Sequence, residues 1–462
     1  MTSAIEVRSR TSAMSSSRIR PAISATPSAY ILPCRTDDPT VGGHPVWRMP
    51  PGLARSTPGV TPGPRSSVTV RGAGGGAASW ASRLTARLAL PGRRADDAGQ
   101  RHASWLELFF DVMFVFALGA VVNRLGHEPR TSAVLAACGL FVVLQWAWVG
   151  QVFYDTRYDP DDIPHRLLVL VALVGVGALT LGVAEAPNGV LLPAGFLVVR
   201  GVLLLLYLRA RSTGEPARLV TNVYLVGFGT GWAIWLASLA VPASTRPAMW
   251  TAAMAVELAT PWLGLRRLSR FPVDVVHLPE RIGQFAIIVL GSALADLLAA
   301  VPARSGPRII GAAAIAFTIP AAVWWVYTTF VNAGLAMARL RGGVGYTHLH
   351  IPLGAGLLLL GWSLGEVVRQ VEADAPTTRP MVRLILAASL VTWMLCGLGL
   401  NWLSVERPGV RRLAITGYGI ASVAVISAVV ARPLPLLVLL AAAVAGYAVL
   451  ASRHLTGQAR RR

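Results

Sequence analysis

The stretch WLELFFDVMFVFALGAVV, residues 105–122, decides the fold class. It is apolar, and its length is close to the roughly 20 residues that a membrane-spanning helix needs. It also carries two carboxylates, Glu107 and Asp111, at the start of the apolar run. Side chains four residues apart share one face of a helix. A carboxylate in hydrocarbon costs about 2.5 kcal/mol or more, so we expect this face to turn toward other helices.

Glu107 and Asp111 each allow two interpretations. A carboxylate in the first turn of a helix is favoured by the helix dipole, so both acids could simply begin the helix in the headgroup zone. Alternatively, both face the interior of a bundle and have partners there. Asp111 lies one turn deeper, which favours the buried, partnered role for it. For Glu107 the two interpretations stay open.

The composition is that of a polytopic membrane protein. Of 462 residues, 54% are hydrophobic and only 14% are charged, whereas soluble domains carry about 25% charged residues. The net charge of +20 comes from arginine alone, because the chain has no lysine. With abundant Ala, Gly and Pro, this set is typical of a GC-rich genome, so we do not infer nucleic-acid binding. Cys34, Cys138 and Cys396 have no metal-binding spacing.

Apolar segments follow one another from residue 105 onward and predict an all-α bundle of about twelve transmembrane helices. Residues 1–100 are rich in Ser, Pro, Gly and Arg, and we expect a disordered tail there. The predicted domains are this tail, a first six-helix half over 101–270 and a second over 271–455. The predicted spans are 105–124, 132–153, 165–184, 188–208, 218–240, 247–265, 281–300, 308–330, 346–369, 381–402, 412–430 and 433–451.

The second half is expected to repeat the first. Each half begins with an acid, a polar residue four positions later and an apolar run that ends in glycine. Paired tryptophans follow in the next segment, and histidines begin the third. Six helices is an even number, so the two halves would run parallel, as in some transporter folds. The matching residues are Glu107, Asp111, Trp146, Trp148 and His165 in the first half, and Glu280, Gln284, Trp324, Trp325, His348 and His350 in the second.

Arginine placement predicts the orientation in the membrane. Loops that face the cytoplasm hold most of the Lys and Arg of a membrane protein. With the N-terminus inside, the larger share of the loop arginines falls on the cytoplasmic side. An even number of helices returns the C-terminus to the same side. We therefore expect a multi-pass membrane protein with both termini in the cytoplasm.

A charged loop joins the second and third predicted spans. In one interpretation its acids and bases form a cytoplasmic gate or a cation vestibule. In the other it is a salt-bridged loop whose acids cap the next helix. No spacing in it is diagnostic of a metal site. The charged residues of this segment, DTRYDPDDIPHRLL, are Asp155, Arg157, Asp159, Asp161, Asp162, His165 and Arg166.

The segment HLPERIGQFAIIVLGSALADLL, residues 277–298, holds the second group of candidate residues. Glu280 and Arg281 precede its apolar run, and Gln284 lies one turn further. We expect an arginine from another helix to pair with Glu280 or Glu107, because adjacent residues do not face each other on a helix. Arg200 lies in the middle of a predicted span and needs a partner. Glu257 is the predicted partner.

Together, the three segments 105–122, 153–168 and 277–291 resemble the low temperature requirement A family of bacterial membrane proteins. The resemblance covers about residues 100–451. It implies a polytopic inner-membrane protein linked to growth in the cold, and it supplies no settled molecular activity. Two acids of the family pattern are absent from the second half, where Ser292 and the pair Thr328-Thr329 stand instead.

Two functions are compatible with these observations. The first is a transporter or channel for a small solute or ion, with Glu107, Asp111, Glu280, Arg281 and Gln284 as its intramembrane residues and Asp111 as the first candidate for titration. The second is a non-transporting assembly, envelope-stress or sensor protein, which a dry, arginine-paired environment around the acids would favour. No enzymatic activity or cofactor is expected, because the sequence has no phosphate loop, HExxH motif or nucleophile elbow. The lipid bilayer is the expected partner, with no nucleic acid.

Overall fold

The computed structural model describes residues 92–93, 104–159, 162–271, 273–274, 276–332, 343–404 and 409–459. The chain divides into two units, Met1–Gly74 and Gly75–Arg462, and every described residue lies in the second unit. The tail predicted over 1–100 therefore falls outside the described residues, apart from Gly92 and Arg93.

The described residues form an all-α fold, as predicted. A single two-residue antiparallel pair joins β1 (Gly92–Arg93) to β2 (Tyr158–Asp159). Short 3-10 helices, η1 (Arg211–Thr213) and η2 (Ser238–Ala240), flank α6. The α-helices are α2 (Trp105–Asn123), α3 (Thr131–Asp155), α4 (Ile163–Glu185), α5 (Leu191–Ala210), α6 (Glu215–Ala237), α7 (Arg246–Leu263), α8 (Leu265–Leu268), α9 (His277–Ala299), α10 (Pro307–Asn332), α11 (Val344–Glu372), α12 (Pro380–Ser404), α13 (Val410–Val429) and α14 (Pro433–Ala459).

Among these described residues, eleven helices are long and apolar enough to cross a membrane. Many large apolar side chains are exposed on them, such as Val174 (74%), Leu181 (69%) and Val226 (71%). A surface of this kind is expected where lipid tails replace water. We therefore take the lipid bilayer as the environment of these helices. The long helix outside the eleven is α7, which has 18 residues and contains Arg246, Glu257 and Pro261.

Each of the twelve predicted spans corresponds to one long helix, but several boundaries were wrong. Helix α9 begins at His277 rather than 281, so Glu280 and Arg281 lie inside its first turns instead of before it. The carboxylate of Asp274 accepts hydrogen bonds from the backbone N–H groups of Val276 and His277, both at 2.8 Å, and this stabilises the earlier start. The apolar run in the sequence locates the part of the helix that lies in lipid. The first residue of the helix is set by the capping hydrogen bonds.

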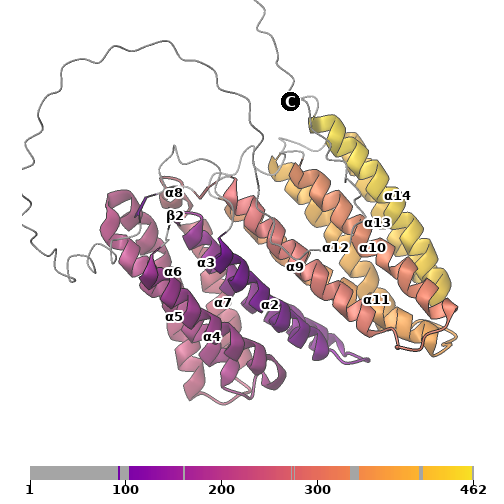
Figure 1. Cartoon of the computed structure of the whole chain (residues 1–462), viewed down its shortest axis with the longest axis horizontal. Helices are drawn as coiled ribbons and strands as arrows, with labels where there is room; N and C mark the ends of the chain where they lie inside the picture. Colours follow the sequence, from indigo (N-terminus) through magenta and orange to yellow (C-terminus); the bar gives the residue numbers. More distant parts are fainter. Residues whose placement is uncertain are drawn as a thin grey trace, which may run out of the picture. The chain divides into compact units, whose positions relative to one another are not determined.

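The helices of the two predicted halves pack mainly with their own neighbours. Figure 1 shows α2–α7 gathered on one side, and α9–α14 on the other, with α2 and α9 between them. Helix α2 packs against both α4 and α9, and α11 packs against α9, α12 and, more lightly, α3. The contact between α2 and α9 therefore brings the two most informative sequence segments together.

Glycines allow close helix packing in the α4–α5 hairpin. A Cβ atom on Gly195 would lie 2.5 Å from the backbone nitrogen of Leu179, and one on Gly182 would lie 2.1 Å from that of Leu192. Small residues at such contacts let helix backbones approach each other in a membrane, where hydrophobic burial gives little driving force between helices. This hairpin is the scaffold on which α2 packs.

Candidate functional site

The main cluster of buried charge lies between α2 and α9. The guanidinium of Arg281 donates to Asp111 Oδ1 at 2.9 Å and lies 3.2 Å from Glu107 Oε2. Arg281 is fully buried, and Glu107 and Asp111 are 5% and 1% exposed. The two carboxylates thus share one cation from the other half of the chain. Asp111 has the buried, partnered role that was favoured for it, and Glu107 has the same role.

Two aromatic side chains, Trp148 on α3 and Phe285 on α9, pack beside this cluster. The indole nitrogen of Trp148 donates to Asp111 Oδ1 at 2.7 Å. Its ring stacks on Phe285 with 4.3 Å between centroids, and the Arg281 guanidinium carbon lies 6.0 Å from the ring centre. Asp111 Oδ1 therefore accepts from two fixed donors in apolar surroundings. Such contacts stabilise a charged carboxylate that has lost its water.

His277 is a further member of the cluster that the sequence analysis did not select. Its Nε2 atom lies 3.3 Å from Glu107 Oε2, and its Nδ1 atom lies 3.8 Å from Glu280 Oε2. Arg281 follows His277 by four residues on α9, so both face α2. This spacing in HLPER was the available signal, and it could be recognised only once the helix was known to begin at His277.

The remaining predicted residues of this group take different positions. Glu280 is partly exposed and contacts His277 rather than the arginine beside it. Gln284 is half-buried, and its Oε1 atom has no hydrogen-bond partner among the described residues. Arg281 is thus the central residue of the set, and Gln284 stands outside the cluster.

The predicted pair of Arg200 and Glu257 is confirmed. Arg200 Nη2 on α5 lies 2.6 Å from Glu257 Oε2 on α7, and both side chains are fully buried. The guanidinium also donates to the carbonyl of Trp146 at 3.1 Å and lies 4.5 Å from the centre of the Phe228 ring. The pair and its contacts join four helices of the first half, α3, α5, α6 and α7.

The charged loop between α3 and α4 is held by hydrogen bonds and ion pairs with residues of α3, α4 and α5. Asp162 caps α4 by accepting from the His165 N–H at 2.9 Å, and its carboxylate binds Arg209 at 2.9 and 3.1 Å. Asp155 accepts from Gln151 at 2.9 Å and lies 3.8 Å from His165 Nε2. These contacts fit the interpretation of a capped, salt-bridged loop.

Arg157, in the same loop, points inward. It is buried, donates to the carbonyls of Phe153 at 2.8 Å and Phe271 at 3.4 Å, and lies 5.4 Å from the centre of the Tyr224 ring. Burial raises the pKa of the neighbouring Tyr158 hydroxyl to about 12, although Arg157 opposes this, so the hydroxyl stays protonated. Arg166 is exposed. The side chain of Asp159 and the whole of Asp161 lie outside the described residues.

A second group of charges joins the halves at the opposite end of α2. Glu366 on α11 is 1% exposed and accepts from Arg369 Nε at 2.9 Å. It also lies 2.6 Å from Nδ1 of His127, in the loop after α2, and 3.5 Å from Arg379. The indole of Trp362 donates to the carbonyl of Gly126 at 3.0 Å. Both ends of α2 are thus held by polar contacts to the second half.

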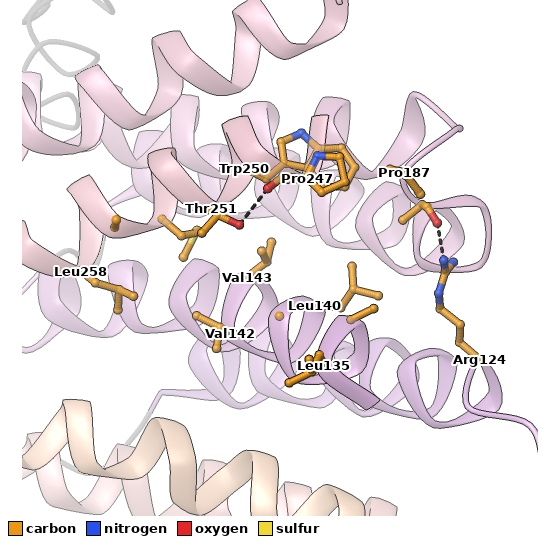
Figure 2. Close-up of a pocket in the computed structure, with 15 residues that line it drawn as sticks. Arg124, Leu135, Leu140, Val142, Val143, Pro187, Pro247, Trp250, Thr251 and Leu258 are labelled. Atoms are coloured by element: carbon orange, nitrogen blue, oxygen red, sulfur yellow. Dashed lines mark hydrogen bonds between the residues drawn. The ribbon is translucent and has the colours of Figure 1, made fainter. Parts of the chain in front are cut away.

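A large apolar cavity of about 560 Å³ lies between α3 and α7. Figure 2 shows the facing side chains, with Arg124 beside Pro187 at one end. The lining contains no carboxylate, so the cavity is separate from the acids described above. Its lining residues are Arg124, Leu135, Ala136, Gly139, Leu140, Val142, Val143, Ala186, Pro187, Pro247, Trp250, Thr251, Met254, Ala255 and Leu258.

Comparison with known proteins places the chain in a family. Residues 102–452 match the family described as bacterial low temperature requirement A protein (LtrA). The chain belongs to this family. The match includes every helix from α2 to α13 and most of α14, and it begins where the described helices begin. The resemblance seen in the three sequence segments is therefore confirmed over the whole bundle.

A comparison with curated proteins adds no activity. An uncharacterized protein of Rhizobium meliloti (strain 1021) is 25% identical to this chain over 248 residues. The aligned part covers 51% of this chain and 60% of the relative, so the chain matches less than two thirds of that protein. No solved structure matches this LtrA chain. Membership thus establishes a polytopic membrane protein of a bacterial family, and the activity must be argued from the contacts.

Proposed function

We propose that this LtrA protein supports the bacterial envelope in the cold without transporting a solute, and that its intramembrane acids are structural. The observation that carries the proposal is Arg281, which lies between Asp111 and Glu107 in a site where all three are almost fully buried. A carboxylate that binds or relays a cation in a membrane faces a water-filled cavity. Here the place of such a cation is taken by an arginine side chain.

The contacts between the halves also support a static role. Transporters built from repeats work largely by rocking one repeat against the other around a central site. In this chain α2 is held to the second half at one end by Arg281 and at the other by the group around Glu366. Rocking would have to break one of these groups in each cycle. A polar side chain that loses its partner inside a membrane has no water to bond to, so breaking the contact costs free energy.

The transporter function, which the sequence analysis put first, is now the second candidate, and the expected repeat favours it. Within each half the order of packing is the same: α2 on α4, α4 on α5, α5 on α6 and α6 on α7 correspond to α9 on α11, α11 on α12, α12 on α13 and α13 on α14. Helices α4 and α11 also share a spacing of glycines, in VGVGALTLG (174–182) and LGAGLLLLG (353–361). A duplicated unit with charges at its interface is an arrangement that transporters use.

We further propose twelve spans with both termini in the cytoplasm and a non-enzymatic role. The 18 residues of α7 are about 27 Å long as a helix, close to the ~30 Å hydrocarbon core. Its polar residues Arg246 and Glu257 are buried, and Glu257 is paired with Arg200. Helix α7 is the least apolar of the long helices, but its polar side chains are buried in the protein, so it can lie in the membrane.

A flux measurement separates the two functions. The purified full-length protein is reconstituted in liposomes that contain a pH-sensitive dye, in potassium or sodium gradients, beside the variant Glu107→Gln/Asp111→Asn. We expect wild-type liposomes to leak no faster than protein-free ones, and the variant to give less folded protein. A wild-type flux that the double variant abolishes would contradict the structural role and establish transport.

A further inference from the structure

The cavity between α3 and α7 has the form of a slot lined by two helical stripes. On α7 the lining residues follow the spacing Pro247, Trp250, Thr251, Met254, Ala255 and Leu258, which is one face of a helix. On α3 the facing stripe contains two small residues, Ala136 and Gly139. The small side chains leave the space between the walls unfilled, and the residues exposed along the opening are Leu135, Gly139, Thr251 and Ala255.

The length of the slot matches one leaflet of a bilayer. From Pro247 to Leu258, α7 advances about 16 Å at 1.5 Å per residue. Half of a ~30 Å hydrocarbon core is about 15 Å. A volume of about 560 Å³ is in the range of sites that bind small amphiphiles. The slot therefore suits a single extended hydrocarbon chain that enters from one leaflet.

The slot is not a requirement of the helix arrangement. In the second half, α14 takes the place that α7 has in the first, and α10 takes that of α3. There α14 packs directly against α10, whereas α7 and α3 barely touch. The first half thus leaves open a space that the second half closes.

Positive charge gathers at the end of the slot. Arg124 lines it and donates to the carbonyls of Val183, Ala184 and Ala186. Arg246, next to Pro247, donates to the carbonyl of Pro187 at 3.1 Å and to those of the next two residues. Carbonyls satisfy N–H groups but carry no net charge. Neither arginine forms an ion pair with a carboxylate among the described residues; the exposed Glu185 carboxylate lies beside Gly189, whose carbonyl accepts from Arg246.

We propose that this slot binds one acyl chain of an anionic phospholipid, with the phosphate of its headgroup at Arg124 and Arg246. Basic pockets between transmembrane helices recognise anionic headgroups, and arginine suits phosphate because its fork donates two hydrogen bonds. The apolar walls hold the chain, and the charge at the end selects the headgroup. This site does not depend on the role of Glu107 and Asp111, since none of the cluster residues lines it.

The test counts bound lipid on the full-length protein by native mass spectrometry. Delipidated protein is titrated in detergent with phosphatidylglycerol or with phosphatidylcholine of the same acyl chains. We expect one phosphatidylglycerol to bind with a preference of about tenfold over phosphatidylcholine, which corresponds to one charge-assisted contact. Arg124→Gln is expected to lose this preference, and Arg124→Lys to keep part of it.

Occluding variants test the slot itself. A Cβ on Gly139 would meet nothing within 4 Å, so Gly139→Leu places its side chain in the open slot without a clash. We expect it to lower phosphatidylglycerol binding about fivefold or more, as should Ala255→Leu on the opposite wall. Gly177→Leu on α4 is the matched control, because Gly177 also has nothing within 4 Å and does not line the slot.

Three results would overturn the proposal. The first is equal binding by Gly139→Leu, Ala255→Leu and the Gly177→Leu control. The second is equal affinity of the wild type for the two phospholipids. The third is a dimer of the wild-type protein that Gly139→Leu converts to a monomer, because the slot would then be filled by a second copy of the chain.

Discussion

The guanidinium of Arg281 faces two carboxylates, Asp111 at 2.9 Å and Glu107 at 3.2 Å, and all three groups are hidden from solvent. Such a group is not a source of net stability by itself, because desolvation offsets most of the attraction between the charges. Removing one member is nevertheless strongly destabilising, because the remaining charged side chains stay buried without their partner.

Arg281→Met should therefore destabilise the protein strongly. It leaves Glu107 and Asp111 close together without the cation, and breaking a buried pair in this way costs about 3–5 kcal/mol. Arg281→Lys should cost less, because it keeps the charge and loses only the fork of donors. Thermal unfolding in detergent measures both. The control is Arg411→Met on α13, where the arginine is exposed; a similar fall in both methionine variants would contradict the prediction.

Residue pairing could be predicted only where the sequence limited the choices. Arg200 and Glu257 both lie in the middle of apolar segments, so each was the most plausible partner of the other. Arg281 was selected as a site residue, but its partners depend on how α2 packs on α9. His277 was missed because a histidine before an apolar run has several ordinary roles. Glu366, in the group of charges at the other end of α2, was not selected as a site residue.

At the scale of the element, the twelve predicted spans each correspond to a long helix of the described residues, eleven of which are candidate membrane spans, but several helix ends were predicted wrongly. Apolar runs of about 20 residues report the hydrocarbon core, and this signal is strong. The ends depend on caps and on polar contacts outside the core. Helix α14 continues to Ala459 rather than 451, and there Asn401 Nδ2 donates to Gln458 Oε1 at 3.3 Å. Hydropathy carries no information about such contacts.

Two glycines of the α4–α5 hairpin should respond in opposite ways when each is replaced by alanine. Gly195→Ala should destabilise the protein by about 1–3 kcal/mol, because the new Cβ would meet backbone atoms of α4 at 2.5 and 2.6 Å. Gly177→Ala, on α4 with nothing within 4 Å, should be neutral or stabilising, since alanine favours a helix over glycine. Unfolding midpoints in detergent compare the two. Equal midpoints would mean that the hairpin adjusts freely and that the close approach is unimportant.

Helix α7 should cross the membrane, and cysteine labelling can show it. In a variant without Cys34, Cys138 and Cys396, a cysteine is placed at Ser244 before α7 or at Ser269 after α8, both of which are exposed. We expect a membrane-impermeant maleimide to label Ser244→Cys in intact cells and Ser269→Cys only after lysis, because inside loops are the arginine-rich ones. Labelling of both from the same side would show that α7 does not cross the membrane. The remaining eleven spans would then place the two termini on opposite sides of it.

At the scale of the whole molecule, two halves meet along α2, α9 and α11. Two of the three segments that reveal the family, 105–122 and 277–291, meet at this contact through Glu107, Asp111 and Arg281. Sequence alone indicated a duplication but could not show that its first helices face each other. The distance along the chain between Asp111 and Arg281 is too long for any local pattern to report.

A triple variant decides whether this contact is structural or functional. Arg281→Met/Glu107→Gln/Asp111→Asn removes all three charges together, and neutral replacement of a buried ionic group is often tolerated although loss of one member is not. The new amides can still meet the Trp148 indole that now bonds Asp111. We expect the triple variant to recover most of the unfolding midpoint lost by Arg281→Met. In a strain that lacks the protein, it should also restore growth in the cold, because the proposed role needs the fold and not the charges. A triple variant that folds well but fails to restore growth would mean that the acids have a function of their own, and transport would then become the better proposal.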